Sequence, residues 1–207
     1  YAISFIIITA GLLASFSRWS WLGWALGLLL ILAQLLRQRR LIAIKKYWQL
    51  AMSVAIIIFV LVSAYGDLFL SRVTASGRLE QRSVSERQAT MDDSIALILA
   101  KPLLGVGLRN YTAAEYSLHP DNIYPQPVHN SILLAASEIG LFGAGVLLWI
   151  LYILMRSAGQ EQKGREAALI LLITMTWLIL GDHWWWDLHF GLLYGGFIIG
   201  IVKMAKD

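Results

Sequence analysis

The sequence predicts an all-α fold, a polytopic bundle of about six transmembrane helices with one large, partly helical loop. Composition is the first reason, because the chain is 58% hydrophobic and only 14% charged, whereas a soluble domain is about a quarter charged. The second reason is the hydropathy pattern, in which six apolar runs are separated by polar joints. Nine Trp and eight Tyr add side chains that favour membrane interfaces.

The apolar runs set the expected helices. A helix that crosses a bilayer needs about 20 apolar residues, with a range of about 17 to 25. The second, third and fourth runs meet this length, and the other three are shorter. We expect the first run to be truncated, because the chain starts inside it without Met, and residues 1–207 to be a single membrane-domain fragment. The runs are Tyr1–Phe16, Trp19–Leu36, Tyr47–Tyr65, Ser131–Met155, Ala167–Leu180 and Leu188–Val202.

The basic residues predict the orientation of the bundle. They gather in the joints that follow the second and fourth runs and after the sixth, and the positive-inside rule places these three positions in the cytoplasm. Alternation then puts the long loop of residues 70–130 outside the cytoplasm, together with Ser17-Arg18 and the segment Asp182–Asp187. The basic residues are Arg37, Arg39, Arg40, Lys45, Lys46, Arg156, Lys163, Arg165, Lys203 and Lys206.

The extracytoplasmic loop is expected to be partly helical. Ser85-Glu86-Arg87-Gln88 is typical of a capping box, apolar residues then recur at helical spacing, and Pro102 ends the pattern. We therefore expect an amphipathic helix over about residues 86–100. The segment His119–Pro127 holds three prolines and is expected to be extended, leading into His129.

Composition also excludes several functions. The chain has no cysteine, so it has no thiol nucleophile, disulfide or cysteine-ligated metal. Nucleic-acid binding is not expected, because the basic residues lie between apolar runs rather than on one soluble face. No recognised metal motif is present. The spacing of His119 and His129 allows a metal pair, but nothing else in the sequence supports one.

Arginines and one histidine are the strongest candidates for chemistry. Arg18 is the only charge between two long apolar runs, and Arg87 and Arg109 lie in the long loop. A planar guanidinium can grip phosphate oxygens with two hydrogen bonds, although a snorkelling or solvated arginine is the alternative for each. His129, followed by Asn130 at the mouth of the fourth run, is a candidate general base. The alternative is a structural interface histidine.

Two further polar groups need an explanation. Glu138 lies about two turns into the fourth run, where a carboxylate should be paired or face a polar cavity. Asp182 and His183 form a second cluster on the predicted outer side, followed by Trp184–Trp186. Tryptophan faces can stack on sugar rings, and anchoring at the membrane interface is the simpler reading.

Several short strings together resemble a known family. Arg87 precedes the string Pro102–Gly107 with Arg109-Asn110, and His129-Asn130 precedes Glu138-Ile139-Gly140. In this order, with Ser17-Arg18 after the first run, they resemble the O-antigen ligase and polymerase superfamily of bacterial envelope glycan enzymes. The resemblance extends from Ser17 to Asp182-His183, and implies that the chain is the C-terminal half of a longer enzyme. Arg109 departs from the family pattern, which has Gly or a small residue there.

The resemblance implies a metal-independent, inverting glycosyltransferase of the bacterial inner membrane, without a cofactor. Its donor would be a glycan on undecaprenyl diphosphate, and its acceptor a glycan or lipid hydroxyl at the extracytoplasmic face. Arg18 and Arg87 would bind the diphosphate, and Arg109 is a further candidate for this binding whose departure from the pattern leaves its role open. His129 would act with Arg87 in catalysis, supported by Asn130, Glu138, Asp182 and His183. The shared motifs do not separate ligase, polymerase and protein glycosyltransferase.

Two other functions remain open from the residues. A small-solute or anion transporter would be expected to carry charges at the bilayer midplane and broken helices, whereas only Glu138 lies well inside a run. A non-catalytic subunit of an envelope polysaccharide assembly system would tolerate loss of the arginine and histidine side chains.

Overall fold

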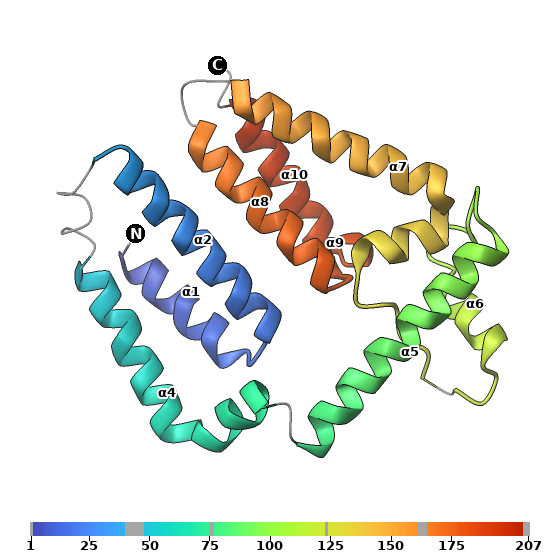
Figure 1. The fold of residues 1–207 in the computed structure, drawn as a ribbon, viewed down its shortest axis with the longest axis horizontal. Coiled ribbons are helices and arrows are strands. Elements are labelled where there is room, and N and C mark those ends of the chain that lie inside the picture. Colours follow the sequence, from blue (N-terminus) through green and yellow to red (C-terminus); the bar gives the residue numbers. More distant parts are fainter. Residues whose placement is uncertain (1, 40–47, 75–76, 123, 161–164, 205–207) are drawn as a thin grey trace. The chain divides into compact units, whose positions relative to one another are not determined.

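The computed structural model describes residues 2–39, 48–74, 77–122, 124–160 and 165–204. Within these ranges all regular secondary structure is helical (Figure 1). The helices are α1 (Ala2–Ala14), α2 (Arg18–Arg37), α4 (Trp48–Thr74), α5 (Arg78–Ala100), α6 (Tyr111–Leu118), α7 (Ser131–Gln160), α8 (Arg165–Gly181), α9 (Trp184–Asp187) and α10 (His189–Met204).

The predicted bundle of apolar helices is confirmed. Each of the six apolar runs forms a helix, namely α1, α2, α4, α7, α8 and α10. Three segments of the described chain are long and apolar enough to cross a membrane, and they are Arg18–Arg37, Trp48–Arg72 and Ser131–Arg156. Shorter apolar helices cover Ala2–Ala14 and Glu166–Gly181.

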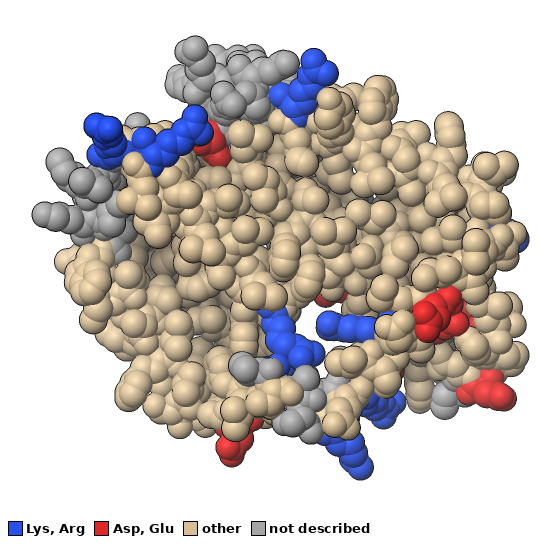
Figure 2. All heavy atoms as spheres, in the orientation of Figure 1, with Lys and Arg blue, Asp and Glu red and all other residues tan. Residues whose placement is uncertain are grey.

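The surface of these helices is suited to lipid. None of the apolar window within Trp48–Arg72 is buried inside the protein, and large side chains such as Phe59, Trp149 and Phe197 are exposed. Figure 2 shows a face on which most residues carry no charge. Soluble monomers rarely expose contiguous apolar patches larger than a few hundred Å², so the protein is a membrane protein.

The chain divides into two compact units, Tyr1–Ser83 and Val84–Asp207. The first unit contains α1, α2 and α4. Ser17 caps α2 by accepting a hydrogen bond from the backbone N–H of Ser20 at 3.3 Å. The Trp21 ring stacks on Phe69 with ring centroids 5.1 Å apart, and Trp21 also donates to the carbonyl of Leu12. These contacts hold the turn that carries Arg18.

The second unit has two hydrophobic clusters. The first joins α7, α8 and α10, which pack on one another, and it consists of Leu151, Ala168, Leu172, Met175, Ile179 and Ile198. The second joins α5, α6 and the start of α7, and it consists of Leu97, Tyr111, Val128 and Leu134. Figure 1 shows that α7 bends sharply near its start. The bend is at Gly140, whose φ of 74° and ψ of 175° are not helical.

The loop helix differs from the sequence prediction at its beginning. The segment of about 86–100 lies within α5, but α5 begins at Arg78 and Ser85 is therefore an internal residue. The physical reason is that no Pro or Gly interrupts the chain between Arg78 and Lys101, so the helix continues back to the residue after Gly77. Arg87 consequently lies inside a helix rather than before it.

Candidate functional site

The start of α7 is fixed by Asn130. Its Oδ1 accepts hydrogen bonds from the backbone N–H groups of Ile132 and Leu133, at 3.0 and 2.9 Å, which is the arrangement of a helix N-cap. Its Nδ2 donates to the carbonyl of Leu180 at the end of α8, at 2.9 Å. One side chain thus caps α7 and ties it to α8.

Ser131 draws the two segments together at the same point. Its backbone N–H and its hydroxyl both donate to the carbonyl oxygen of Asp182, at 3.0 and 2.7 Å. The neighbouring Val128 is fully buried among Leu97, Tyr111 and Leu134. His129 therefore lies between a buried anchor and a helix cap, which leaves its backbone little freedom.

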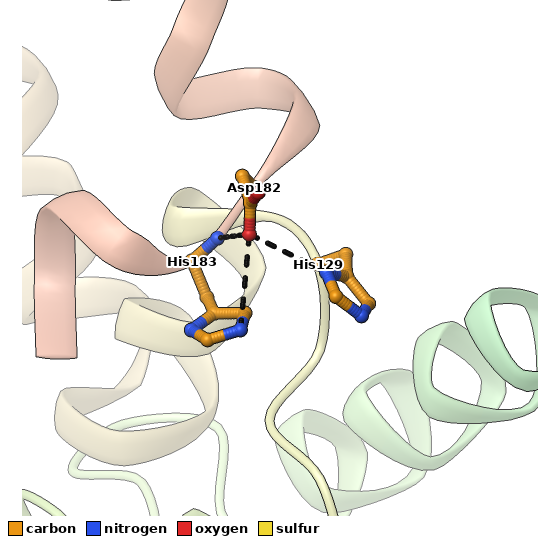
Figure 3. A group of neighbouring side chains, drawn as sticks. All are labelled: His129, Asp182 and His183. Atoms are coloured by element: carbon orange, nitrogen blue, oxygen red, sulfur yellow. Dashed lines mark hydrogen bonds and ion pairs between the residues drawn. The ribbon is translucent and has the colours of Figure 1, made fainter. Parts of the chain in front are cut away.

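This arrangement brings His129 against Asp182. The Nδ1 of His129 lies 3.3 Å from Oδ1 of Asp182, and the two residues are 53 positions apart in the sequence. His183 flanks the same carboxylate, with its ring centroid 5.1 Å from that of His129 (Figure 3). The side chains of both histidines are partly exposed, so small molecules can reach the group.

The surroundings of Asp182 favour its charged form. Burial by itself would raise its pKa, but the hydrogen bonds with His129 and with the backbone N–H of His183, together with the charges of the two histidines, hold the pKa of Asp182 below its ordinary value. A carboxylate that stays ionised can only accept hydrogen bonds. It therefore fixes Nδ1 of His129 as the donor, and in the neutral ring Nε2 then carries a lone pair.

His183 is oriented by a second carboxylate. Its Nδ1 lies 3.0 Å from Oδ1 of Asp187, one turn further along α9. Its Nε2 lies 3.7 Å from Oδ1 of Asp182. Ligating atoms of His129, Asp182 and His183 all lie within 4.8 Å of one another. His119, in contrast, contacts Asp93 through its Nε2 at 2.7 Å.

Glu138 is buried and links three helices. Its Oε1 accepts from the backbone N–H of Tyr111 on α6, at 3.3 Å, and its Oε2 accepts from Nε1 of Trp186 on α9, at 2.8 Å. The Tyr111 hydroxyl in turn donates to the carbonyl of Thr90 on α5, at 2.8 Å. Glu138 thus connects the turn of α5 that follows Arg87 with the segment that carries His183.

The string Pro102–Gly107 fills the bend in α7. The backbone N–H groups of Val106 and Gly107 donate to the carbonyls of Ser137 and Glu138, at 2.8 and 2.9 Å. The N–H of Leu141 beyond the bend donates to the carbonyl of Pro102 at 2.8 Å. The loop therefore satisfies backbone groups that the broken helix leaves without intrahelical partners.

Two glycines make this contact possible. Gly105 and Gly140 both have positive φ, 68° and 74°. A Cβ atom on Gly105 would collide with the backbone of Glu138, and one on Gly140 would collide with the backbone of Leu103. Glycine is thus required at positions 105 and 140 by one close backbone contact.

Arg109 has a backbone conformation that explains the family pattern at its position. Its φ is 60°, in the left-handed region that Gly adopts without cost and other residues rarely adopt. Its exposed guanidinium donates to the carbonyl of Asp187 at 3.5 Å. The side chain therefore lies beside α9, whose carboxylate orients His183.

The other two candidate arginines lie on separate elements. Arg87 is exposed on α5, and no described residue forms a hydrogen bond or ion pair with its guanidinium. Arg18 belongs to the first unit, where its Nη1 donates to the carbonyl of Arg72 at 3.3 Å. Within the second unit, the structure thus brings together His129, Asn130, Asp182 and His183, and connects Glu138 and Arg109 to α9.

The sequence did not identify several residues that hold this group together. Asp187 follows His183 by four residues, and this helical spacing is the sequence signal that could have indicated their contact. No sequence signal indicates the contacts of Tyr111 and Trp186 with Glu138, because these residues are distant in the sequence. Trp185 packs against the cluster of α7, α8 and α10, and Trp186 binds Glu138, so these two rings support the protein interior.

A second ionisable cluster links α5 and α6. Glu115 is 2% exposed and its Oε2 has no hydrogen-bond partner among the described residues. Burial raises the pKa of Glu115, and the charge of Asp93 raises it further, whereas hydrogen bonds with the backbone of Gln126 and with Asn122, and the charge of His119, act in the opposite direction. The neutral form of this carboxyl group therefore persists to higher pH in the folded protein than in the unfolded chain.

Replacing Glu115 by Gln should stabilise the protein relative to the wild type, and this difference should grow as pH rises. A raised folded pKa means that the stability contributed by Glu115 is present at low pH and is lost as pH rises through that pKa. At pH values above 4.5, the ordinary pKa of the Glu115 carboxyl group, the melting temperature of the wild type should therefore fall relative to that of Glu115→Gln. The melting temperatures are measured in detergent from acid to neutral pH. Asp121→Asn removes an exposed carboxylate and should leave the pH profile unchanged. A constant difference between Glu115→Gln and wild type would contradict the assignment.

Comparison with known proteins gives one match. The sequence model of the O-antigen ligase family matches residues 3–150. No curated protein and no solved structure matches the chain. The matched range includes Arg18, Arg87, Arg109 and the segment His129–Glu138, and it ends before Asp182. The match assigns the protein a general role in membrane glycan processing, with lipid-linked glycans as the broad class of substrate. The chain is a helical membrane protein that belongs to the O-antigen ligase family.

Proposed function

We propose that the protein transfers a glycan from an undecaprenyl-diphosphate carrier to an acceptor hydroxyl at the extracytoplasmic face of the bacterial inner membrane. The observation that carries this proposal is the pairing of His129 with Asp182, at 3.3 Å, at the start of α7. The family match supplies the class of substrate. The acceptor is a hydroxyl of another glycan or of a lipid.

His129 acts as the general base. Its Nδ1–H is held by Asp182, so Nε2 presents a lone pair to an acceptor hydroxyl. As the hydroxyl oxygen bonds to the anomeric carbon, its proton passes to Nε2. The bond from the anomeric carbon to the phosphate oxygen breaks and the diphosphate leaves with the electron pair. A single displacement of this kind inverts the anomeric centre, and Asp182 stabilises the imidazolium that forms.

The arginines bind the diphosphate. Negative charge grows on the leaving phosphate as the glycosidic bond breaks, and fixed positive groups lower the energy of that state. Arg87 suits this role because its exposed guanidinium has no partner among the described residues. Arg109, on the loop beside α9, is assigned to the same diphosphate.

Changing Arg87 provides the test. Arg87→Ala should abolish or strongly reduce glycan transfer to a purified acceptor, and Arg87→Lys should restore only part of it, because lysine keeps the charge and loses the two-pronged geometry. Transfer is measured with the full-length protein in vesicles that contain undecaprenyl-diphosphate glycan. A strain that carries Arg87→Ala should accumulate this glycan-lipid. Arg156→Ala, which removes an exposed arginine at the far end of α7, is the matched control. Normal transfer by Arg87→Ala would overturn the role of this residue.

A further inference from the structure

A pair of facing acceptor atoms lies at the centre of the histidine cluster. Oδ1 of Asp187 is 3.0 Å from Nδ1 of His183, and a carboxylate can only accept a hydrogen bond. Nδ1 of His183 therefore carries the proton, and in the neutral ring Nε2 carries a lone pair. This lone pair faces Oδ1 of Asp182 at 3.7 Å. A proton on Nε2, or a metal ion between the two atoms, makes this contact favourable.

The distances fit a small transition-metal ion. With metal–ligand bonds of about 2.0–2.1 Å, neighbouring ligands of a tetrahedral zinc ion are about 3.3–3.4 Å apart. Nδ1 of His129 is 3.3 Å from Oδ1 of Asp182, and Nε2 of His183 is 3.7 Å from the same atom. The potential ligand atoms all lie within 4.8 Å of one another.

The surroundings have the features of a metal-binding site. Histidines that bind metals usually donate their other ring N–H to a carboxylate or a carbonyl, and His183 makes this contact with Asp187. The three side chains are partly exposed, 30% for His129, 39% for Asp182 and 19% for His183, so an ion can enter and a fourth position is open to water. Two imidazoles with one carboxylate suit zinc and its neighbours rather than calcium or magnesium.

We propose that His129, Asp182 and His183 form a three-ligand zinc site that inhibits the enzyme. Without zinc, Nδ1 of His129 holds its proton against Asp182 and Nε2 is free to act as a base. To bind zinc, Nδ1 must lose that proton and use its lone pair, and the ring then carries its proton on Nε2. The general base is thereby removed. This inhibitory consequence depends on the proposed function, whereas zinc binding itself does not.

Metal binding is tested directly on the full-length protein in detergent. After treatment with a chelator, Co²⁺ should bind at one equivalent per chain and give the visible absorption of four- or five-coordinate cobalt, and Zn²⁺ should displace it. His183→Ala should abolish this signal. Asp187→Asn should keep all three ligands but weaken binding about 10–100-fold, because it removes the carboxylate that orients His183. Absence of a stoichiometric Co²⁺ signal, or a signal unchanged in His183→Ala, would overturn the proposal.

His119→Ala is the matched control for metal binding. His119 also contacts a carboxylate, Asp93, at 2.7 Å, but it belongs to no group of three ligand atoms in the described part of the chain. The variant should bind Co²⁺ as the wild type does. Loss of the signal in His119→Ala with retention in His183→Ala would place the ion elsewhere and refute the assignment.

Inhibition is then measured as glycan transfer in the presence of Zn²⁺. Wild-type transfer should fall with increasing zinc and recover when a chelator is added, and Asp187→Asn should need about 10–100-fold more zinc for the same inhibition. Transfer that is insensitive to zinc at saturating occupancy would refute the inhibitory role and leave the metal site in place. If metal-free protein binds Co²⁺ as expected but transfers no glycan, the proposed function fails and the metal site stands.

Discussion

His129→Ala should lower the rate of glycan transfer about 10²–10⁴-fold, the usual contribution of general-base catalysis. The acceptor hydroxyl would have to lose its proton to water instead of to Nε2. Binding of the glycan-lipid should change little, because the diphosphate is assigned to arginines on other elements. The measurement is single-turnover transfer at saturating donor, with donor binding determined separately.

Asp182→Asn tests the same pairing from the other side. The amide keeps the size of the side chain and removes the negative charge that stabilises the imidazolium, so the rate should fall by a comparable factor. The backbone carbonyl of Asp182, which accepts from Ser131, is unaffected, and the fold should be retained. His119→Ala is the control, since His119 is held by Asp93 rather than Asp182. Wild-type rates in His129→Ala would refute the base assignment.

Gly140→Ala should destabilise the protein by about 2 kcal/mol or more. The backbone of Gly140, with φ of 74° and ψ of 175°, is a conformation that essentially only glycine adopts, and it costs a residue with Cβ about 1–3 kcal/mol. Here the added Cβ would also collide with the backbone of Leu103. The loop Pro102–Gly107 would have to leave the bend, which would free the carbonyls of Ser137 and Glu138. Transfer should be lost together with stability, because Glu138 connects α6 and α9.

Gly145→Ala provides a matched control on the same helix. A Cβ at this position meets no atom within 4 Å, and alanine in a helix interior is favoured over glycine by about 1 kcal/mol. The melting temperature in detergent should therefore fall in Gly140→Ala and stay equal or rise in Gly145→Ala. Equal melting temperatures for the two variants would contradict the role of Gly140 in the bend.

The structure gives Glu138 and the glycines a physical role that the sequence left open. From the sequence, Glu138 was a carboxylate that needed a partner inside an apolar run. Its partners, Tyr111 and Trp186, are 27 and 48 positions away, and no local pattern identifies them. Gly140 appears in the sequence as one of several small residues. Only the contact with Leu103 shows why a side chain is excluded there.

The sequence by itself determined the membrane helices and the family. Apolar runs and helical spacing are local properties that can be read directly from the sequence. They indicate helices because lipid requires every backbone polar group of a spanning segment to be satisfied within the segment itself. The strings around Arg87, Arg109 and His129 carried the resemblance that the family match confirms.

The tertiary structure alone decided how these residues meet. Asn130 and Ser131 tie α7 to the end of α8 and so bring His129 to Asp182 across 53 positions. Asp187 orients His183 within the same cluster. The bend at Gly140 is stabilised by a loop that precedes it by more than 30 residues. Such pairings depend on packing and backbone hydrogen bonds between distant segments, and neither hydrophobic periodicity nor motif spacing encodes them.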